Sequence, residues 1–130
     1  MKKRAGKEGC ALAEAQKKKV AVVGSRGITR ADLSKYVPED AAVILSGGAR
    51  GVDQLAEEYA KERGLGLEVL LPNYELFGKT APLIRDRQIV DKADLVVAIW
   101  DGSSSGTRYT IEYAKAQGVP VKLFIPKQYE

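Results

Sequence analysis

The sequence predicts an α/β protein with a single doubly wound parallel sheet of five strands in the order 3-2-1-4-5. Two observations lead to this prediction. Five short apolar runs alternate with segments of helical periodicity, and three of the runs are followed by glycine-rich turns. Because right-handed crossovers bring the carboxyl ends of parallel strands to one edge of the sheet, we expect the three turns to meet there.

Each apolar run predicts one strand. The first run, Lys19–Val23, is continuous rather than alternating, as expected for a strand that is covered on both faces. Proline directly follows two of the runs, at Pro72 and Pro126, and ends the expected strands there. The five expected strands are 19–23, 41–45, 65–71, 94–100 and 120–125.

Two helices are expected in the first half of the chain. Thr29 is placed to cap a short helix over Arg30–Tyr36, which Pro38 stops. Apolar residues recur at helical spacing over 54–63, so this segment predicts an amphipathic helix. Gly64 follows it, at the position where glycine commonly ends a helix.

Two more helices are expected in the second half. One opens at Thr80–Pro82, where proline is tolerated in the first turn, and the other ends at Gly118. The segment 73–79 has no regular pattern and is expected to be irregular. Its aromatic residues, Tyr74 and Phe77, indicate a contact with a ligand or with the partner subunit of a homodimer.

The composition excludes several classes of protein. No apolar run approaches the roughly 20 residues of a membrane span, and the basic start lacks the apolar region of a secretory signal. A single cysteine, Cys10, excludes an internal disulfide and suits the cytoplasm. The absence of histidine excludes Ser-His-Asp triads and most zinc sites. Nothing in the sequence predicts a metal site or a bound cofactor.

The positive charge is concentrated at the N-terminus. Residues 1–19 contain seven basic and two acidic side chains, whereas residues 20–130 contain 14 basic and 15 acidic ones. We therefore expect a basic, flexible tail over 1–18, followed by a single α/β domain over 19–126. The tail is either a solvated leader or a contact for nucleic acid through counterion release.

Each glycine-rich turn joins a strand to a helix and exposes backbone N–H groups at the positive end of that helix. Such a site suits an anion, and the nearby hydroxyls and arginines suit a phosphate. We therefore expect a nucleotide or nucleotide-derived phosphorylated ligand. The predicted ligand-binding residues are Gly24, Ser25, Arg26, Ser46, Gly47, Gly48, Arg50, Gly51, Asp53, Arg87, Gly102, Ser103, Ser104, Ser105, Gly106 and Thr107.

The turns match neither of two common nucleotide motifs. The chain has no Gly-Lys-Ser/Thr, and its first turn lacks the Gly-x-Gly-x-x-Gly spacing. This argues against a P-loop ATPase and against an ordinary NAD-dependent dehydrogenase.

The acidic residues near the turns each allow two interpretations. Asp53 either stabilises the start of a helix or contacts a ribose hydroxyl. Asp101 either contacts a ligand, as a hydrogen-bond acceptor or as a general base, or holds its own loop through bonds to backbone amides. Glu112 is expected to be a solvated helix residue.

The ordered set of motifs resembles the SLOG superfamily of Rossmann-like proteins. The resemblance rests on Val22–Arg26, Ser46–Asp53, Arg87 with Asp94, and Gly106-Thr107, and it covers about residues 19–125. The superfamily includes the DNA-processing protein A (Smf) and the Lonely guy (LOG) phosphoribohydrolases. The resemblance implies a Rossmann-like domain that binds or senses a nucleotide derivative at the strand ends.

Two alternative functions follow from the same resemblance. A LOG-like enzyme would release the base from a nucleoside 5′-monophosphate, with Arg87 and either Asp101 or Glu112 as catalytic residues. The glutamate expected three residues after Gly-Thr is replaced by Thr110, and Glu112 is the nearest carboxylate. The other alternative is binding of single-stranded DNA, as the resemblance to the DNA-processing protein implies.

Overall fold

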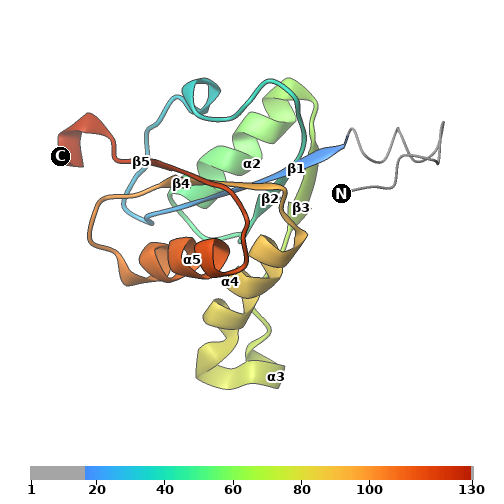
Figure 1. Cartoon of the computed structure of the whole chain (residues 1–130), viewed down its shortest axis with the longest axis vertical. Helices are drawn as coiled ribbons and strands as arrows, with labels where there is room; N and C mark the ends of the chain where they lie inside the picture. The colour runs from blue at the N-terminus through green and yellow to red at the C-terminus, as the bar shows by residue number, and fades with distance from the viewer. Residues whose placement is uncertain (1–16, 130) are drawn as a thin grey trace.

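Five parallel strands form one sheet in the order β3-β2-β1-β4-β5 (Figure 1). The structure, a computed structural model, describes residues 17–129. The tail expected over 1–18 falls almost entirely outside these residues. The strands are β1 (Lys18–Gly24), β2 (Ala41–Ser46), β3 (Gly66–Val69), β4 (Leu95–Ile99) and β5 (Val121–Phe124).

The centre of the sheet is the pair formed by β1 and β4, in which Val22 is opposite Val97. β1 also pairs with β2, so the order of the strands reverses direction at β1. The predicted order and parallel arrangement are therefore confirmed. The switch in strand order between β1 and β4 is the place where open α/β sheets commonly bind ligands.

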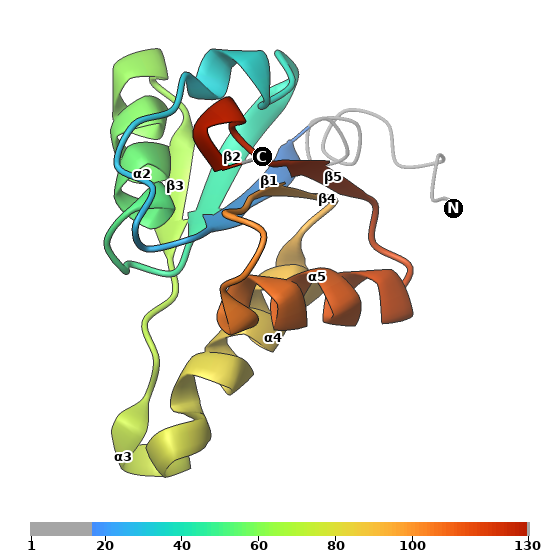
Figure 2. The same ribbon diagram turned by 90° about the vertical axis from the view of Figure 1, so that its left-hand side faces the viewer.

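Helices cover both faces of the sheet (Figure 2). α2 (Val52–Arg63) packs on one face together with the 3-10 turn η1 (Leu33–Lys35). α4 (Ala81–Lys92) and α5 (Ser105–Ala116) pack on the other face. Alternate residues of β1 enter the two cores, which explains why its apolar run is continuous.

The prediction of a helix over Arg30–Tyr36 is wrong. Only Leu33–Lys35 form a 3-10 turn, and Asp32 rather than Thr29 caps it. The Asp32 carboxylate accepts hydrogen bonds from the Ser34 amide at 3.2 Å and from the Ser34 hydroxyl at 2.6 Å. These local bonds compete with a regular helix, as short polar side chains commonly do.

The segment after β3 also differs from the prediction. β3 is shorter than the expected 65–71, and part of the segment expected to be irregular forms α3 (Tyr74–Phe77) and the 3-10 turn η2 (Gly78–Thr80). In both views α3 lies far from the sheet (Figures 1 and 2). Leu71, Tyr74 and Leu76 are all more than half exposed there. Contact of this segment with a partner subunit stays a prediction.

The helix ends mostly follow the predictions. α2 ends at Gly64, which has a φ of 67° and donates its N–H to the carbonyls of Ala60 and Lys61. α4 begins at Ala81 with proline in its first turn. Within residues 17–129, every helix is too short or too polar to cross a membrane.

Candidate functional site

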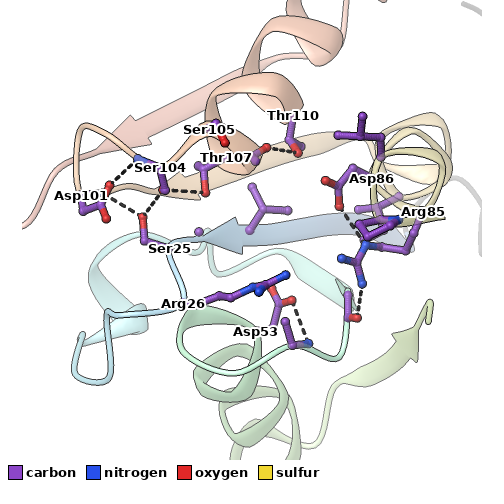
Figure 3. Close-up of a pocket in the computed structure, with 18 of the residues that line it drawn as sticks. Ser25, Arg26, Asp53, Arg85, Asp86, Asp101, Ser104, Ser105, Thr107 and Thr110 are labelled. Carbon is purple, nitrogen blue, oxygen red and sulfur yellow. Dashed lines mark hydrogen bonds and ion pairs between the residues drawn. The ribbon is translucent and has the colours of Figure 1, made fainter. Parts of the chain in front are cut away.

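A cleft of about 480 Å³ opens beside the carboxyl ends of β1 and β4. Its wall includes residues 24–27 after β1, Gly47, Ala49 and Asp53 around the second turn, and residues from 101–107 after β4. One face of α4 completes it. The three glycine-containing turns, which are far apart in the sequence, therefore meet at one cleft (Figure 3).

A buried hydroxyl joins the first turn to the third. The Ser25 N–H donates to the Ile99 carbonyl at 3.1 Å, and the Asp101 N–H donates to Ser25 Oγ at 3.0 Å. Ser25 Oγ also lies 2.8 Å from Ser104 Oγ. Because Ser25 is only 1% exposed, these bonds hold the two turns at a fixed separation on either side of the cleft.

Asp101 is turned toward its own loop. Its Oδ1 accepts hydrogen bonds from the Ser103 amide at 2.9 Å and from the Ser104 amide at 2.8 Å. These bonds lower the pKa of Asp101 to about 2. A carboxylate with such a low pKa is a weak base at neutral pH, so the geometry favours the interpretation in which Asp101 orders the loop.

The start of α5 forms one side of the cleft. Ser104 is the N-cap residue, and neither a side-chain cap nor an acidic residue of the first turn occupies this end of the helix in the described chain. Ser105, Gly106 and Thr107 line the cleft and carry the first amides of the helix. The Ser104 amide already donates to Asp101 Oδ1, so the amides of Ser105, Gly106 and Thr107 are those available to an anion at the positive end of the helix dipole.

The glycines of the second turn are packed against other groups. A Cβ atom on Gly47 would lie 2.8 Å from Arg85 Nη1 and 3.0 Å from Asp53 Oδ2. A Cβ on Gly51, whose φ is 78°, would lie 2.4 Å from the Arg26 carbonyl oxygen. These glycines allow the second turn to approach the first turn and α4 closely.

Gly24 has a similar packing role in the first turn. A Cβ atom there would lie 2.2 Å from the Ile99 carbonyl oxygen and 2.6 Å from a methyl carbon of Val52. Gly24 therefore allows β1, β4 and α2 to come together at the base of the cleft.

Arg85 and Asp86 are cleft residues that the sequence analysis missed. Arg85 is 7% exposed; its Nε donates to Asp86 Oδ1 at 2.8 Å, and its Nη1 donates to the Gly47 carbonyl. The spacing of Ala81, Arg85 and Ile89 at intervals of four could have identified Arg85, because all three share the buried face of α4.

Asp53 lies on the cleft wall with 8% of its surface exposed. Its Oδ2 accepts a hydrogen bond from the Ala49 amide at 3.1 Å. Burial raises the pKa of Asp53 to about 6, although the Ala49 amide and the Arg85 charge both lower it. Burial also raises the pKa of Asp86, and this effect exceeds the opposing effect of Arg85.

The predicted catalytic residues Arg87 and Glu112 do not line the cleft. Arg87 is exposed and donates from Nε to the Tyr109 hydroxyl, with its guanidinium 5.8 Å from the Tyr109 and Tyr113 ring centres. Glu112 is exposed on α5. Thr110, which stands where the resemblance expects a glutamate, does line the cleft and donates to the Gly106 carbonyl at 3.0 Å.

The predicted ligand-binding residues divide into two groups. Those on the cleft wall are Gly24, Ser25, Arg26, Gly47, Asp53, Ser104, Ser105, Gly106 and Thr107. Those away from the wall are Ser46, Gly48, Arg50, Gly51, Arg87, Gly102 and Ser103. Ser46, for example, is buried, and its hydroxyl donates a hydrogen bond to Glu57 Oε2 at 3.0 Å. Among residues 17–129, no three His, Cys, Asp or Glu side chains gather as metal ligands.

Comparison with known proteins gives three informative relatives. Gene 61 protein of Mycobacterium phage D29 is 34% identical over 85 residues, which cover 61% of this chain and 68% of the phage protein. Translation initiation factor IF-2 from Desulfovibrio desulfuricans and from Oleidesulfovibrio alaskensis is 37% identical over 86 residues, covering 65% of this chain. The chain spans only 8% of the length of these two factors. No solved structure gives a significant match.

The sequence model of one protein family matches the chain over residues 9–75. This match covers more than half of the 130 residues and includes β1, β2, β3 and the first two glycine turns, whereas α4, β4 and α5 lie beyond it. Its residues 9–16 lie outside the described part of the structure. The extent of this match shows that the chain belongs to the family described as DNA recombination-mediator protein A.

Proposed function

We propose that the cleft binds a nucleotide or a nucleotide-derived phosphorylated ligand. The observation that carries this proposal is the meeting of three glycine-containing turns at the open end of α5. The amides of 105–107 and the hydroxyls of Ser105 and Thr107 suit the phosphate, and the exposed Arg26 also lines the cleft.

The size and lining of the cleft support a ligand of this kind. Its volume of about 480 Å³ lies within the range of roughly 300–1,000 Å³ for small-molecule sites. Pro82, Leu83 and Ile89 supply an apolar part of the wall, which suits a nucleobase. Phosphate, sugar and base could therefore each meet matching surface within one cleft.

Single-stranded DNA is the second candidate, because the family is described as a DNA recombination-mediator protein. A DNA strand presents a row of phosphates and needs a positively charged groove. The cleft instead combines two arginines with three aspartates: Arg26, Arg85, Asp53, Asp86 and Asp101. Residues 17–129 contain 17 basic and 14 acidic side chains, so the described part is close to neutral. These charges favour a single nucleotide.

Calorimetric titration of the full chain with AMP, GMP, CMP and UMP tests the proposal. We expect at least one of these ligands to bind, and the matching nucleoside without phosphate to bind more weakly. Arg26→Gln should weaken binding by about tenfold, the loss of one charged hydrogen bond. Arg30→Gln is the matched control, because Arg30 is exposed and does not line the cleft.

Two outcomes would contradict the proposal, and a third would keep the nucleotide in the cleft but add an activity. One is that none of the nucleotides binds while a labelled DNA oligonucleotide binds tightly and with strong salt dependence, which would favour the DNA candidate. Another is equal weakening by Arg26→Gln and Arg30→Gln. The third is release of free adenine from AMP, which would identify the chain as a phosphoribohydrolase rather than a binding module.

A further inference from the structure

Two carboxylates from different elements, Asp53 and Asp86, line the cleft near Arg85 (Figure 3). Asp86 on α4 accepts from Arg85 Nε at 2.8 Å. Asp53, in the first turn of α2, and Arg85 both approach Gly47. A Cβ atom added to Gly47 would lie 3.0 Å from Asp53 Oδ2 and 2.8 Å from Arg85 Nη1. The three side chains therefore form one charged cluster in the wall of the cleft.

This cluster retains the capacity to accept hydrogen bonds. Within residues 17–129, the hydrogen bonds to the Asp53 carboxylate reach only Oδ2, from the Ala49 amide at 3.1 Å. Asp53 is 8% exposed, and a buried acceptor is normally satisfied by a donor. Each carboxylate offers two oxygens with about four acceptor sites in total. Hydroxyl or amino donors of a ligand would therefore complement this part of the cleft.

The same cluster is a poor site for the phosphate itself. The charge of Arg85 is already opposed by Asp86, and one of its nitrogens is taken by the Gly47 carbonyl. Two carboxylates beside a phosphate would repel it. The phosphate is better placed at the start of α5, where the first-turn amides are available. The group that reaches the carboxylates must then be an uncharged part of the ligand that carries donors.

We propose that Asp53 and Asp86 select a ribose over a deoxyribose by accepting hydrogen bonds from the adjacent 2′ and 3′ hydroxyls. This inference rests on the proposed function, because it assumes that a nucleotide occupies the cleft. The sugar lies between phosphate and base in a nucleotide. The side chains of Asp53 and Asp86 are mostly buried in the cleft wall, whereas Leu83 is 38% exposed. The ligand class is thus a ribonucleotide derivative with a free vicinal diol.

The test compares ligands that differ by a single hydroxyl. Each ribonucleoside 5′-monophosphate is titrated into the full chain beside its 2′-deoxy and 3′-deoxy counterparts. Loss of either hydroxyl should weaken binding by about tenfold, because a site built to accept from a hydroxyl is left unpaired. A bound ribonucleotide with no such loss would overturn the inference while leaving the proposed function intact. Failure of every nucleotide to bind would overturn both.

Substitutions assign the selectivity to the carboxylates. Asp86→Asn keeps an oxygen that can accept from Arg85, and it should reduce the ratio of ribose to deoxyribose affinity to about threefold or less by weakening the ribonucleotide alone. Asp53→Asn is the second variant, used with the first so that misfolding of one does not decide the result. Asp91→Asn is the matched control, since Asp91 is exposed on α4 and does not line the cleft.

The ratio for the Asp91→Asn protein should equal that of the unmodified chain. If both cleft variants keep the ratio of ribose to deoxyribose affinity of the unmodified chain, other groups discriminate between the sugars and the assignment is wrong. If the cleft variants instead alter the preference between AMP and IMP, which share a ribose and differ in the base, the carboxylates contact the base and the inference is also wrong.

Discussion

The second and third turns both contain glycine but differ in what surrounds them. Both follow a buried strand and precede a helix. In the second turn, a Cβ on Gly47 or Gly51 would collide with Arg85 or with the Arg26 carbonyl. In the third turn, a Cβ on Gly102 or Gly106 would meet nothing within 4 Å. The second turn is a packing element, whereas the third has open space beside its glycines.

The carboxylates of the two turns show the same contrast. Asp53 is buried beside the second turn, and its pKa is raised to about 6. Asp101 is solvated in the third turn, and hydrogen bonds from two amides lower its pKa to about 2. Glycine and aspartate in a turn therefore do not define a role by themselves. The neighbours brought by the fold decide whether the turn supports structure or stays accessible to a ligand.

The largest expected effect is on stability, from alanine at the packed glycine. Gly51→Ala should lower the free energy of unfolding by about 3 kcal/mol or more, because it combines backbone strain with a collision against the first turn. Gly102→Ala shares the positive φ but not the collision, so it should cost about 1 kcal/mol. Urea denaturation of both proteins measures the difference. Equal losses would show that the packing contrast has no energetic consequence.

A pH series sharpens the comparison of the carboxylates. The folded pKa of Asp53 lies above its ordinary value of 3.8, so its contribution to stability is present below about pH 4 and is lost as the pH rises through about 6. Asp53→Asn removes this dependence, and its stability relative to the unmodified chain should rise by about 3 kcal/mol between pH 4 and pH 8.

Asp101 should behave in the opposite way. Its folded pKa is lowered, so it contributes stability above about pH 4 that is lost as the pH falls toward 2. Asp101→Asn should therefore be less stable than the unmodified chain at neutral pH, and the difference should vanish in acid. Chemical denaturation at each pH measures both variants. Changes of the same sign in the two variants would contradict the contrast.

The smallest effect is expected at the open glycine of the third turn. Gly106 lies in the first turn of α5 with free space at its Cβ position. Gly106→Ala should raise the free energy of unfolding by about 0.5–1 kcal/mol, because alanine loses less backbone freedom on entering a helix. Thermal unfolding is a sufficient measurement. A clear loss of stability would mean that the space beside Gly106 is needed by the folded protein.

The fold could be predicted because its signals are local. Apolar runs and helical periodicity gave the elements, and their alternation indicated a doubly wound parallel sheet, for which 3-2-1-4-5 is a common strand order. Convergence of the three turns followed because parallel strands have their carboxyl ends at the same edge of the sheet. The helix expected over Arg30–Tyr36 failed because the Asp32 carboxylate bonds to Ser34, a local competition that apolar periodicity does not register.

The site could be predicted only in part, because its chemistry depends on tertiary neighbours. Arg26 and Ser25 were found beside the first turn, but Arg87 was chosen on α4 where Arg85 faces the cleft. Two residues along a helix turn a side chain by about 200°, so the choice between them decides the face. The packing of Gly51 against the Arg26 carbonyl has no signature in the sequence.

The central position of β4 has a consequence for when the cleft comes into existence. β4 inserts between β1 and β5, and it carries the third turn, so a nascent chain that has emerged only as far as residue 75 holds the segment that identifies its family but not a complete binding site. A ligand of the cleft would therefore recognise only the finished domain. By mass action it would draw partly folded chains toward that state and serve as a reporter of completed folding.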